Sequence, residues 1–178
     1  MGWCWVRQMI LQLLILITML VVFLSSWGWV APSDAIAAIR QLEEAPGQVV
    51  YQSRQTLTDQ SGKSWQAIAF KRIRPDGSNQ FYLRLVGFPG TVTINHFQPL
   101  ILKDSMGKTL TAADVSSQIF TDTSSPEPHV GQYDLQPLLP QLHAELPWRL
   151  SLPTTDGKSL TLQVSPSLMQ EWKTLADL

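Results

Sequence analysis

The sequence predicts a mainly β fold, an antiparallel sandwich or partly open barrel of about eight strands with a C-terminal amphipathic helix. Short segments of alternating apolar residues recur along the chain, turn residues separate them at intervals of about ten residues, and only the last segment has a helical period. An apolar stretch at the N-terminus forms a separate element, a signal or anchor helix. The 178 residues, 44% of them hydrophobic, suffice for one domain beyond that stretch.

The N-terminal stretch has the features of two kinds of targeting segment. Met9 to Val30 holds no charged residue, and a single positive side chain precedes it. This start, the apolar core and the small residues of Ala35-Ile36-Ala37 match a secretory signal that is cut before Ala38. The run is also long enough to be an uncleaved membrane anchor. Tryptophans flank it about 36 Å apart, which suits aromatic residues at both membrane interfaces. Both interpretations divide the chain into residues 1–37 and an exported β-rich domain, residues 38–178.

The first strands are expected in two successive hairpins that follow a polar lead-in ending at Pro46-Gly47. The expected strands are residues 49–57, 64–74 and 80–87. The strongest turn signal is Pro75-Asp76-Gly77-Ser78, where proline presets the first corner and glycine permits a positive φ. In the third strand Phe81, Leu83 and Leu85 occupy alternate positions, so they are expected on the core face.

The second half of the chain predicts more strands and a helix at the end. These strands are residues 91–95, 99–103, 146–152 and 160–164. Thr111 to Asp114 resembles a capping box, so a short helix is expected there. Tyr133 to Leu142 is expected to hold another short helix, because prolines limit its length, and Asp122 to Pro128 is expected to be an exposed loop. The last helix begins at Ser165 or Ser167, and its apolar stripe, which includes Trp172, is expected to pack on the sheet.

Composition and motifs exclude several functions. The formal net charge is -1, from 13 Lys+Arg against 14 Asp+Glu, so the chain lacks the basic surplus of a nucleic-acid-binding protein. Cys4 is the only cysteine and precedes the apolar run, which leaves no thiol chemistry in the exported part. Gly-Lys-Ser/Thr occurs at Gly62, Gly107 and Gly157 without the earlier glycine of a phosphate loop, so these sites are expected to be turns.

No cofactor, metal site or catalytic residue is expected from the motifs. The histidines His96, His129 and His143 form no pair with a spacing typical of metal ligands. The sequence also lacks the Gly-x-Ser-x-Gly motif of the α/β-hydrolases.

One basic concentration, Lys71-Arg72-Ile73-Arg74 together with Arg84, is a candidate interaction site. On paired strands these arginines would form a small positive patch for an acidic partner, or they would protect an exposed strand edge. Phe88, between Gly87 and Gly90, would contact a partner or fold back onto the sheet. The candidate partner-binding residues are therefore Arg72, Arg74, Arg84 and Phe88.

Six stretches between about Ile39 and Trp172 are distinctive in combination. They are Glu43-Glu44-Ala45-Pro46-Gly47-Gln48, Phe70-Lys71-Arg72, Leu83 to Gly90, Val130 to Leu135, Arg149 to Pro153 and Gln170-Glu171-Trp172. Together they resemble a cyanobacterial family known as domain of unknown function 3122. The resemblance implies a cyanobacterial owner and hence the thylakoid lumen or the periplasm as destination. It implies no reaction and no functional residues.

We therefore expect a non-catalytic lumenal or periplasmic binding protein, an auxiliary or assembly factor of a photosynthetic membrane complex. It would be soluble after cleavage, or anchored through residues 9–30 with its N-terminus in the cytoplasm. One alternative is a carrier that holds a small apolar ligand inside a barrel lined by Trp65, Phe70, Phe81 and Trp148. A second alternative is a hydrolase, which would need a serine, a histidine and an acid brought together by the fold.

Overall fold

The structure is a computed structural model that describes residues 39–119 and 126–178, together with residues 3, 7, 9, 12, 13 and 15–19. The chain divides into two units, Met1–Ile36 and Ala37–Leu178. The described residues of the first unit are helical, and in the described part of the chain no helix has both the length and the apolar character needed to cross a membrane. Most of the apolar run Met9 to Val30 and the predicted cleavage site lie outside the described residues.

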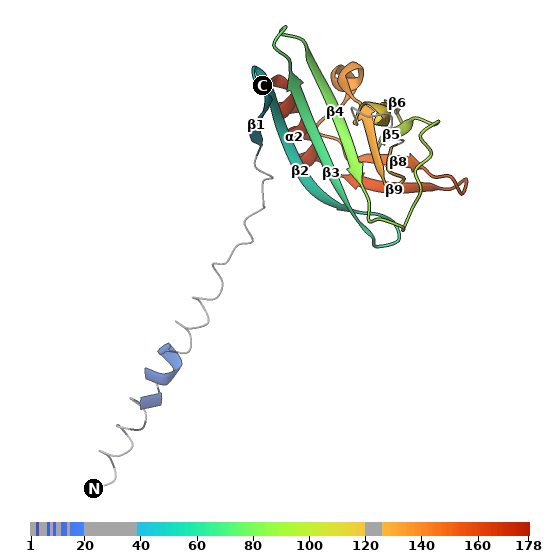
Figure 1. Ribbon diagram of the computed structural model, residues 1–178. Helices are drawn as coiled ribbons and strands as arrows, with labels where there is room; N and C mark the ends of the chain where they lie inside the picture. The colour runs from blue at the N-terminus through green and yellow to red at the C-terminus, as the bar shows by residue number, and fades with distance from the viewer. Residues whose placement is uncertain are drawn as a thin grey trace. The chain divides into compact units, whose positions relative to one another are not determined.

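The second unit is built on one antiparallel sheet with the strand order β1-β2-β3-β4-β7-β6-β5-β8-β9 (Figure 1). The strands are β1 (Arg40–Ala45), β2 (Gln48–Thr58), β3 (Ser64–Ile73), β4 (Asn79–Val86), β5 (Leu100–Asp104), β6 (Thr109–Asp114), β7 (Val130–Asp134), β8 (Trp148–Pro153) and β9 (Ser159–Val164). The helical elements of this unit are η2 (Ser116–Gln118), η3 (Gln136–Gln141) and α2 (Pro166–Asp177). The predicted mainly β fold with a C-terminal helix is confirmed.

The hairpins have a common chemistry that the sequence encodes locally. Gly62 and Gly107 adopt positive φ angles of 79° and 94°, which a residue without a β-carbon tolerates. In each of these two turns an aspartate carboxylate, that of Asp59 or Asp104, accepts the backbone N–H groups two and four residues further on. These hydrogen bonds fix the turn, and the next strand begins directly after it. The Gly-Lys-Ser/Thr sequences are therefore turns, as predicted.

Helix α2 covers the inner face of the sheet. Its first turn is capped by Ser165, whose hydroxyl accepts the backbone N–H of Leu168 at 3.3 Å, as the sequence predicts. The helix contacts β2 and β3, and Figure 1 shows it behind these strands. Its buried residues are Leu168, Met169, Trp172 and Leu175. They join Phe81, Leu83 and Leu85, all fully buried, in the main core, so the predicted core face of β4 is confirmed.

The sheet closes partly on itself where β2 ends. Asp59 forms an isolated antiparallel bridge with Leu162 of β9. Beside it, the Gln60 side chain accepts the backbone N–H of Thr161 at 2.6 Å and donates to the carbonyl of Ser159 at 3.3 Å. The first and last parts of the sheet therefore meet at this end, which agrees with a partly open barrel.

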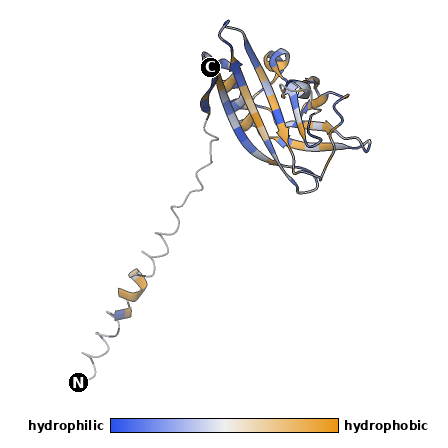
Figure 2. Cartoon of the chain, viewed as in Figure 1, coloured by the Kyte–Doolittle hydropathy of each residue, from blue (hydrophilic) through white to orange (hydrophobic). Residues whose placement is uncertain are grey.

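Three predicted elements are wrong. The polar lead-in contains the edge strand β1, whose residues are all exposed and hydrophilic for the most part (Figure 2), so no apolar alternation marked it. Residues 91–95 form only a single bridge, from Ile94 to Thr154. The expected helix near Thr111 is the strand β6, because pairing with β5 and β7 outweighs the capping signal.

The Tyr133 to Leu142 segment supplies the end of β7 and then the short helix η3.

Candidate functional site

The outer face of the sheet, opposite the main core, carries a second apolar cluster on β2, β3 and β4. Its buried members are Val50, Ile68, Phe70 and Tyr82. The register pairs Phe70 with Tyr82 and Val50 with Arg72, so these side chains point to the same face. The solvent side of an antiparallel sheet is usually polar, and a buried aromatic cluster there requires a cover.

Two arginine side chains supply part of that cover. The guanidinium carbons of Arg72 and Arg84 lie 5.6 Å and 5.3 Å from the centre of the Phe70 ring. At these distances a guanidinium is attracted to the ring face, and the arginine stem shields the ring from water. The Tyr82 ring tilts against Phe70 with ring centres 5.5 Å apart, and its hydroxyl donates to Gln118 of η2 at 3.4 Å. The Phe70 ring therefore lies close to two cationic side chains, with the Tyr82 ring beside it.

Arg84 is held in place by a neutral partner. Its Nε and Nη2 atoms donate to the side-chain oxygen of Gln132 at 3.1 Å and 2.7 Å, and Gln132 is only 1% exposed. Burial lowers the pKa of Arg84, and the charges of Arg72 and Arg54 lower it further, while Glu44 opposes them. An arginine still remains protonated in such surroundings. Arg84 therefore places a positive charge on this face, and no carboxylate of a described residue lies within ion-pair distance of it.

Two further arginines of this face differ in their partners. Arg72 binds Glu44 through Nε at 3.0 Å and Nη2 at 3.3 Å. Arg54 is exposed and forms no ion pair with any described residue. It pairs across β2 and β3 with Ile68, which in turn pairs with Arg84, so Arg54 and Arg84 belong to one row. We call Phe70, Arg54, Arg72 and Arg84 the arginine face.

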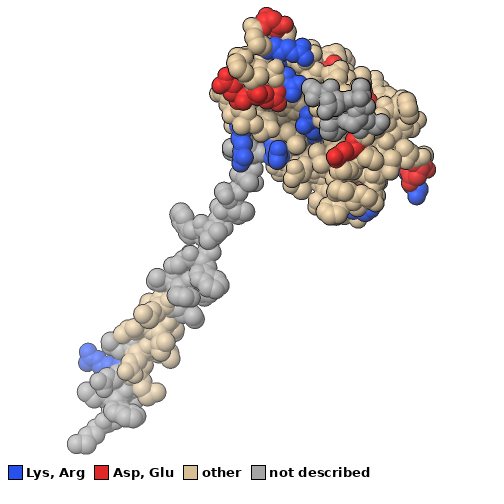
Figure 3. Space-filling model, viewed as in Figure 1, with Lys and Arg blue, Asp and Glu red and all other residues tan. Residues whose placement is uncertain are grey.

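Most aspartates lie at strand ends instead of on the strand faces. Each accepts a backbone N–H group of its own turn; these residues are Asp59, Asp76, Asp104, Asp114, Asp134 and Asp156. Among the described residues of the outer strand faces, only Glu44 and Asp134 are acidic. The near-neutral total therefore hides a separation of charge: Figure 3 shows basic groups over the face of β2 to β4, with acidic groups gathered beside them at the edge.

The structure brings together only some of the predicted site residues. Arg72 and Arg84 meet over Phe70. Arg74 lies just beyond β3 and is exposed in the hairpin that leads to β4. Phe88 is 72% exposed and follows the opposite end of β4, so it does not join the other residues.

Sequence reasoning missed two contributors to this face. Arg54 could have been found, because every second residue of a strand points to the same face and Arg54 lies an even number of positions from the outer residue Val50. Gln132 could not, because it reaches Arg84 only through the pairing of β4 with β7, across nearly fifty residues of chain.

The histidines do not form a metal site or a complete triad in the described part of the chain. His96 Nδ1 lies 3.0 Å from the Asp114 carboxylate, whereas its Nε2 is buried and has no hydrogen-bond partner there. A serine hydroxyl on that second nitrogen is what a Ser-His-Asp site requires. Within residues 39–119 and 126–178, no three His, Cys, Asp or Glu side chains are grouped so that they could hold a metal ion.

The aromatic residues proposed to line a ligand cavity are divided between the two faces of the sheet. Trp65, Phe81 and Trp148 lie in the main core at 2% exposure or less, where they pack with Trp172 of α2. Phe70 lies on the outer face under the arginines. These four residues therefore do not surround one common space.

Fold and site together define a class of protein: a partly closed antiparallel β-sheet with a helix on its inner face and a cationic outer face. The chain belongs to the family described as Protein of unknown function (DUF3122), whose model matches residues 37–175. The match covers the β-domain and confirms the resemblance expected from the sequence. Comparisons with curated proteins and with solved structures found no match to the chain.

Proposed function

We propose that this protein acts by binding and not by catalysis, as an auxiliary or assembly factor of a photosynthetic membrane complex on the lumenal or periplasmic side of the membrane. The observation that carries the binding role is the arginine face, where the guanidinium of Arg84 donates to the neutral amide of Gln132 and forms no ion pair with a described residue. The compartment and the complex are supported by the apolar N-terminal run and by the resemblance of the six sequence stretches to a cyanobacterial family.

The partner that fits this face is an acidic surface segment of a membrane protein. Arg54 forms no ion pair with a described residue, and Arg84 uses two of its N–H groups on Gln132, so further donors remain for carboxylates. Phe70 and Tyr82 provide an apolar base beneath these charges. These rings are themselves buried and hold the guanidinium of Arg84 in position, so an acidic side chain of the partner would pair with the donors of Arg54 and Arg84 that remain.

The test is a pull-down of the full chain, tagged at its C-terminus, from gently solubilised host membranes. Arg54→Glu reverses an exposed charge that pairs with no carboxylate in the described part of the chain, so we expect the fold to stay intact, and Arg84→Glu reverses the charge at the centre of the face. We expect each variant to recover at least about tenfold less of the membrane-complex subunits. Recovery by the unaltered protein should also fall as salt is raised, because surface charges are screened.

Lys158→Glu is the matched control, because Lys158 is an equally cationic residue in a distant turn and its side chain is 83% exposed. It should recover the same subunits as the unaltered protein. Full recovery with both arginine variants would refute the arginine face as the docking site. A tagged protein that brings down no membrane-complex subunit would refute the auxiliary role itself.

A further inference from the structure

A second cationic surface lies on the other half of the sheet, on the outer faces of β5, β8 and β9. The register places Lys103 beside Arg149 and Arg149 beside Gln163, so the three side chains form one row across these strands. All three residues are exposed. Neither cation forms an ion pair with any residue that the structure describes.

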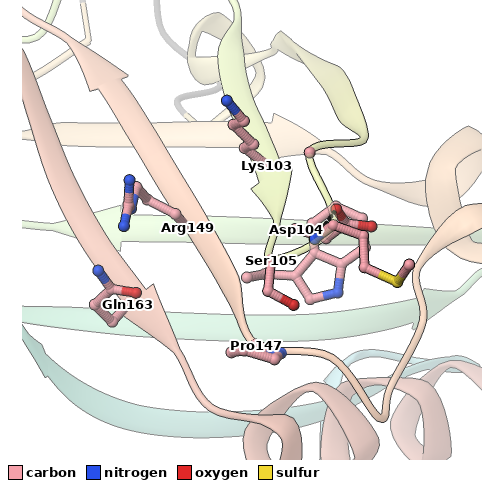
Figure 4. Close-up of a pocket in the computed structure, with 9 residues that line it drawn as sticks. Lys103, Asp104, Ser105, Pro147, Arg149 and Gln163 are labelled. Atoms are coloured by element: carbon pink, nitrogen blue, oxygen red, sulfur yellow. Dashed lines mark hydrogen bonds between the residues drawn. The ribbon is translucent and has the colours of Figure 1, made fainter.

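This row borders a hollow of about 420 Å³, which is within the size range of small-molecule sites. Figure 4 shows Lys103, Arg149 and Gln163 projecting from three neighbouring strands, with Ser105 and Pro147 further along the border. Trp148 also lines the hollow, and as a residue it is 1% exposed. Its indole donates to a backbone carbonyl at 2.9 Å, which fixes this part of the wall.

The charge in the hollow is positive on balance. Among the described residues that line it, the one carboxylate belongs to Asp104, a residue that is 7% exposed. This carboxylate is already engaged, because Oδ1 accepts the backbone N–H groups of Met106 at 2.9 Å and Lys108 at 2.8 Å. The remaining outer residues of the surrounding strands are neutral; among them are Ile101, Thr109, Thr111, Ser151 and Thr161.

We propose that this hollow binds a small molecule that carries an oxyanion group, a phosphate or a carboxylate. The guanidinium of Arg149 can donate to two oxygens of such a group, Lys103 adds a second positive charge, and the amide of Gln163 adds neutral donors. Met106, 81% exposed beside them, offers an apolar contact for the rest of the ligand. The site does not depend on the partner proposed for the arginine face.

The test is titration calorimetry of the full chain in detergent micelles with two probes, inorganic pyrophosphate and citrate. We expect saturable binding of at least one probe, with backbone amide shifts in NMR spectra confined to β5, β8, β9 and the adjoining turn. The double variant Lys103→Gln/Arg149→Gln should bind at least about tenfold more weakly, because two charge-assisted contacts are lost. Both replaced residues are exposed, so this variant should fold normally.

Lys158→Gln is the control, since it removes one exposed positive charge from a turn outside the hollow. It should bind the probe as the unaltered chain does. Binding of pyrophosphate alone identifies a phosphate ligand, and binding of citrate alone identifies a carboxylate ligand; either result supports the site. Absence of saturable binding for both probes, or binding that survives in the double variant, would overturn it. Arg54→Glu should leave the titration unchanged, which separates this result from the test of the arginine face.

Discussion

The Asp59 carboxylate connects a hairpin to the core through three hydrogen bonds. It accepts the backbone N–H groups of Ser61 at 2.7 Å and Lys63 at 2.9 Å, and the indole N–H of Trp65 at 3.2 Å. Burial acts to raise the pKa of Asp59, but these hydrogen bonds and the charge of Lys63 lower it below its ordinary value. Asp59→Asn replaces one accepting oxygen with a donor, so we expect the free energy of unfolding to fall by about 1–3 kcal/mol at pH 7.

The pH dependence of this loss follows from the direction of the pKa shift. Because the pKa of Asp59 is lower in the folded state, its charge stabilises the fold above the ordinary aspartate pKa of 3.8, and this stabilisation disappears as pH falls through the folded value. Urea unfolding at pH 7, 5 and 3 should show the gap between the two proteins narrowing only at the lowest pH. Asp104→Asn is the control, since Asp104 accepts two turn amides but no indole. A gap that does not change with pH would contradict the assignment.

At the scale of elements, α2 ends against a buried lysine of the sheet. Lys71 of β3 is 8% exposed, and its ammonium donates to the carbonyl of Ala176 in the last turn of α2 at 2.7 Å. A cation at the C-terminus of a helix pairs with carbonyls that lack an intrahelical donor. Lys71→Met keeps the length of the side chain and removes this contact, so we expect a loss of about 1–2 kcal/mol in unfolding free energy.

Hydrogen exchange would locate that loss. The amides in the last turn of α2 should exchange faster in Lys71→Met, while those at its Ser165-capped start remain protected. Lys158→Met, in an exposed turn, should change neither quantity. Equal exchange along the whole helix would mean that Lys71 does not hold its C-terminal end.

The elements that the sequence predicts well are those whose pairing is local. Strands β2, β3 and β4 follow one another through tight turns, and their apolar alternation survives in the fold. Strand β1 has no such signal, because all of its residues are exposed and it is held by pairing with β2 and by the ion pair of Glu44 with Arg72 of β3. Strand β6 has only Leu110 and Ala112 facing the core, and its conformation depends on pairing with β5 through a tight turn and with β7 across a long connection. Local propensity could not outweigh that pairing in advance.

At the scale of the whole molecule, the same distinction applies to the two surfaces. Arg72 and Arg84 are on adjacent hairpin strands, so the sequence predicts their proximity. The row of Lys103, Arg149 and Gln163 requires β5 to pair with β8 across more than forty residues, which neither turns nor alternation reveal. The net charge of -1 misleads for a related reason, because it does not show that the turns hold most of the aspartates.

Closure of the sheet is the feature that involves the whole molecule, and it depends strongly on one side chain. Gln60, in the β2–β3 turn, accepts the backbone N–H of Thr161 and donates to the carbonyl of Ser159. Its side-chain amide therefore makes the hydrogen bonds that a neighbouring strand would make with the start of β9. Gln60→Ala leaves both backbone groups to water. We expect unfolding free energy to fall by about 1 kcal/mol and the Thr161 amide to exchange faster.

The matched control is Gln66→Ala, which removes an exposed glutamine near the start of β3, where it pairs with Val86 at the end of β4. It should leave the Thr161 amide protected. If instead Gln60→Ala leaves Thr161 fully protected, then the Asp59 to Leu162 bridge alone holds the two parts of the sheet together. Faster exchange that spreads from Thr161 along β9 and into α2 would show that closure stabilises the inner helix as well, because α2 follows β9 directly in the chain and packs on β2 and β3.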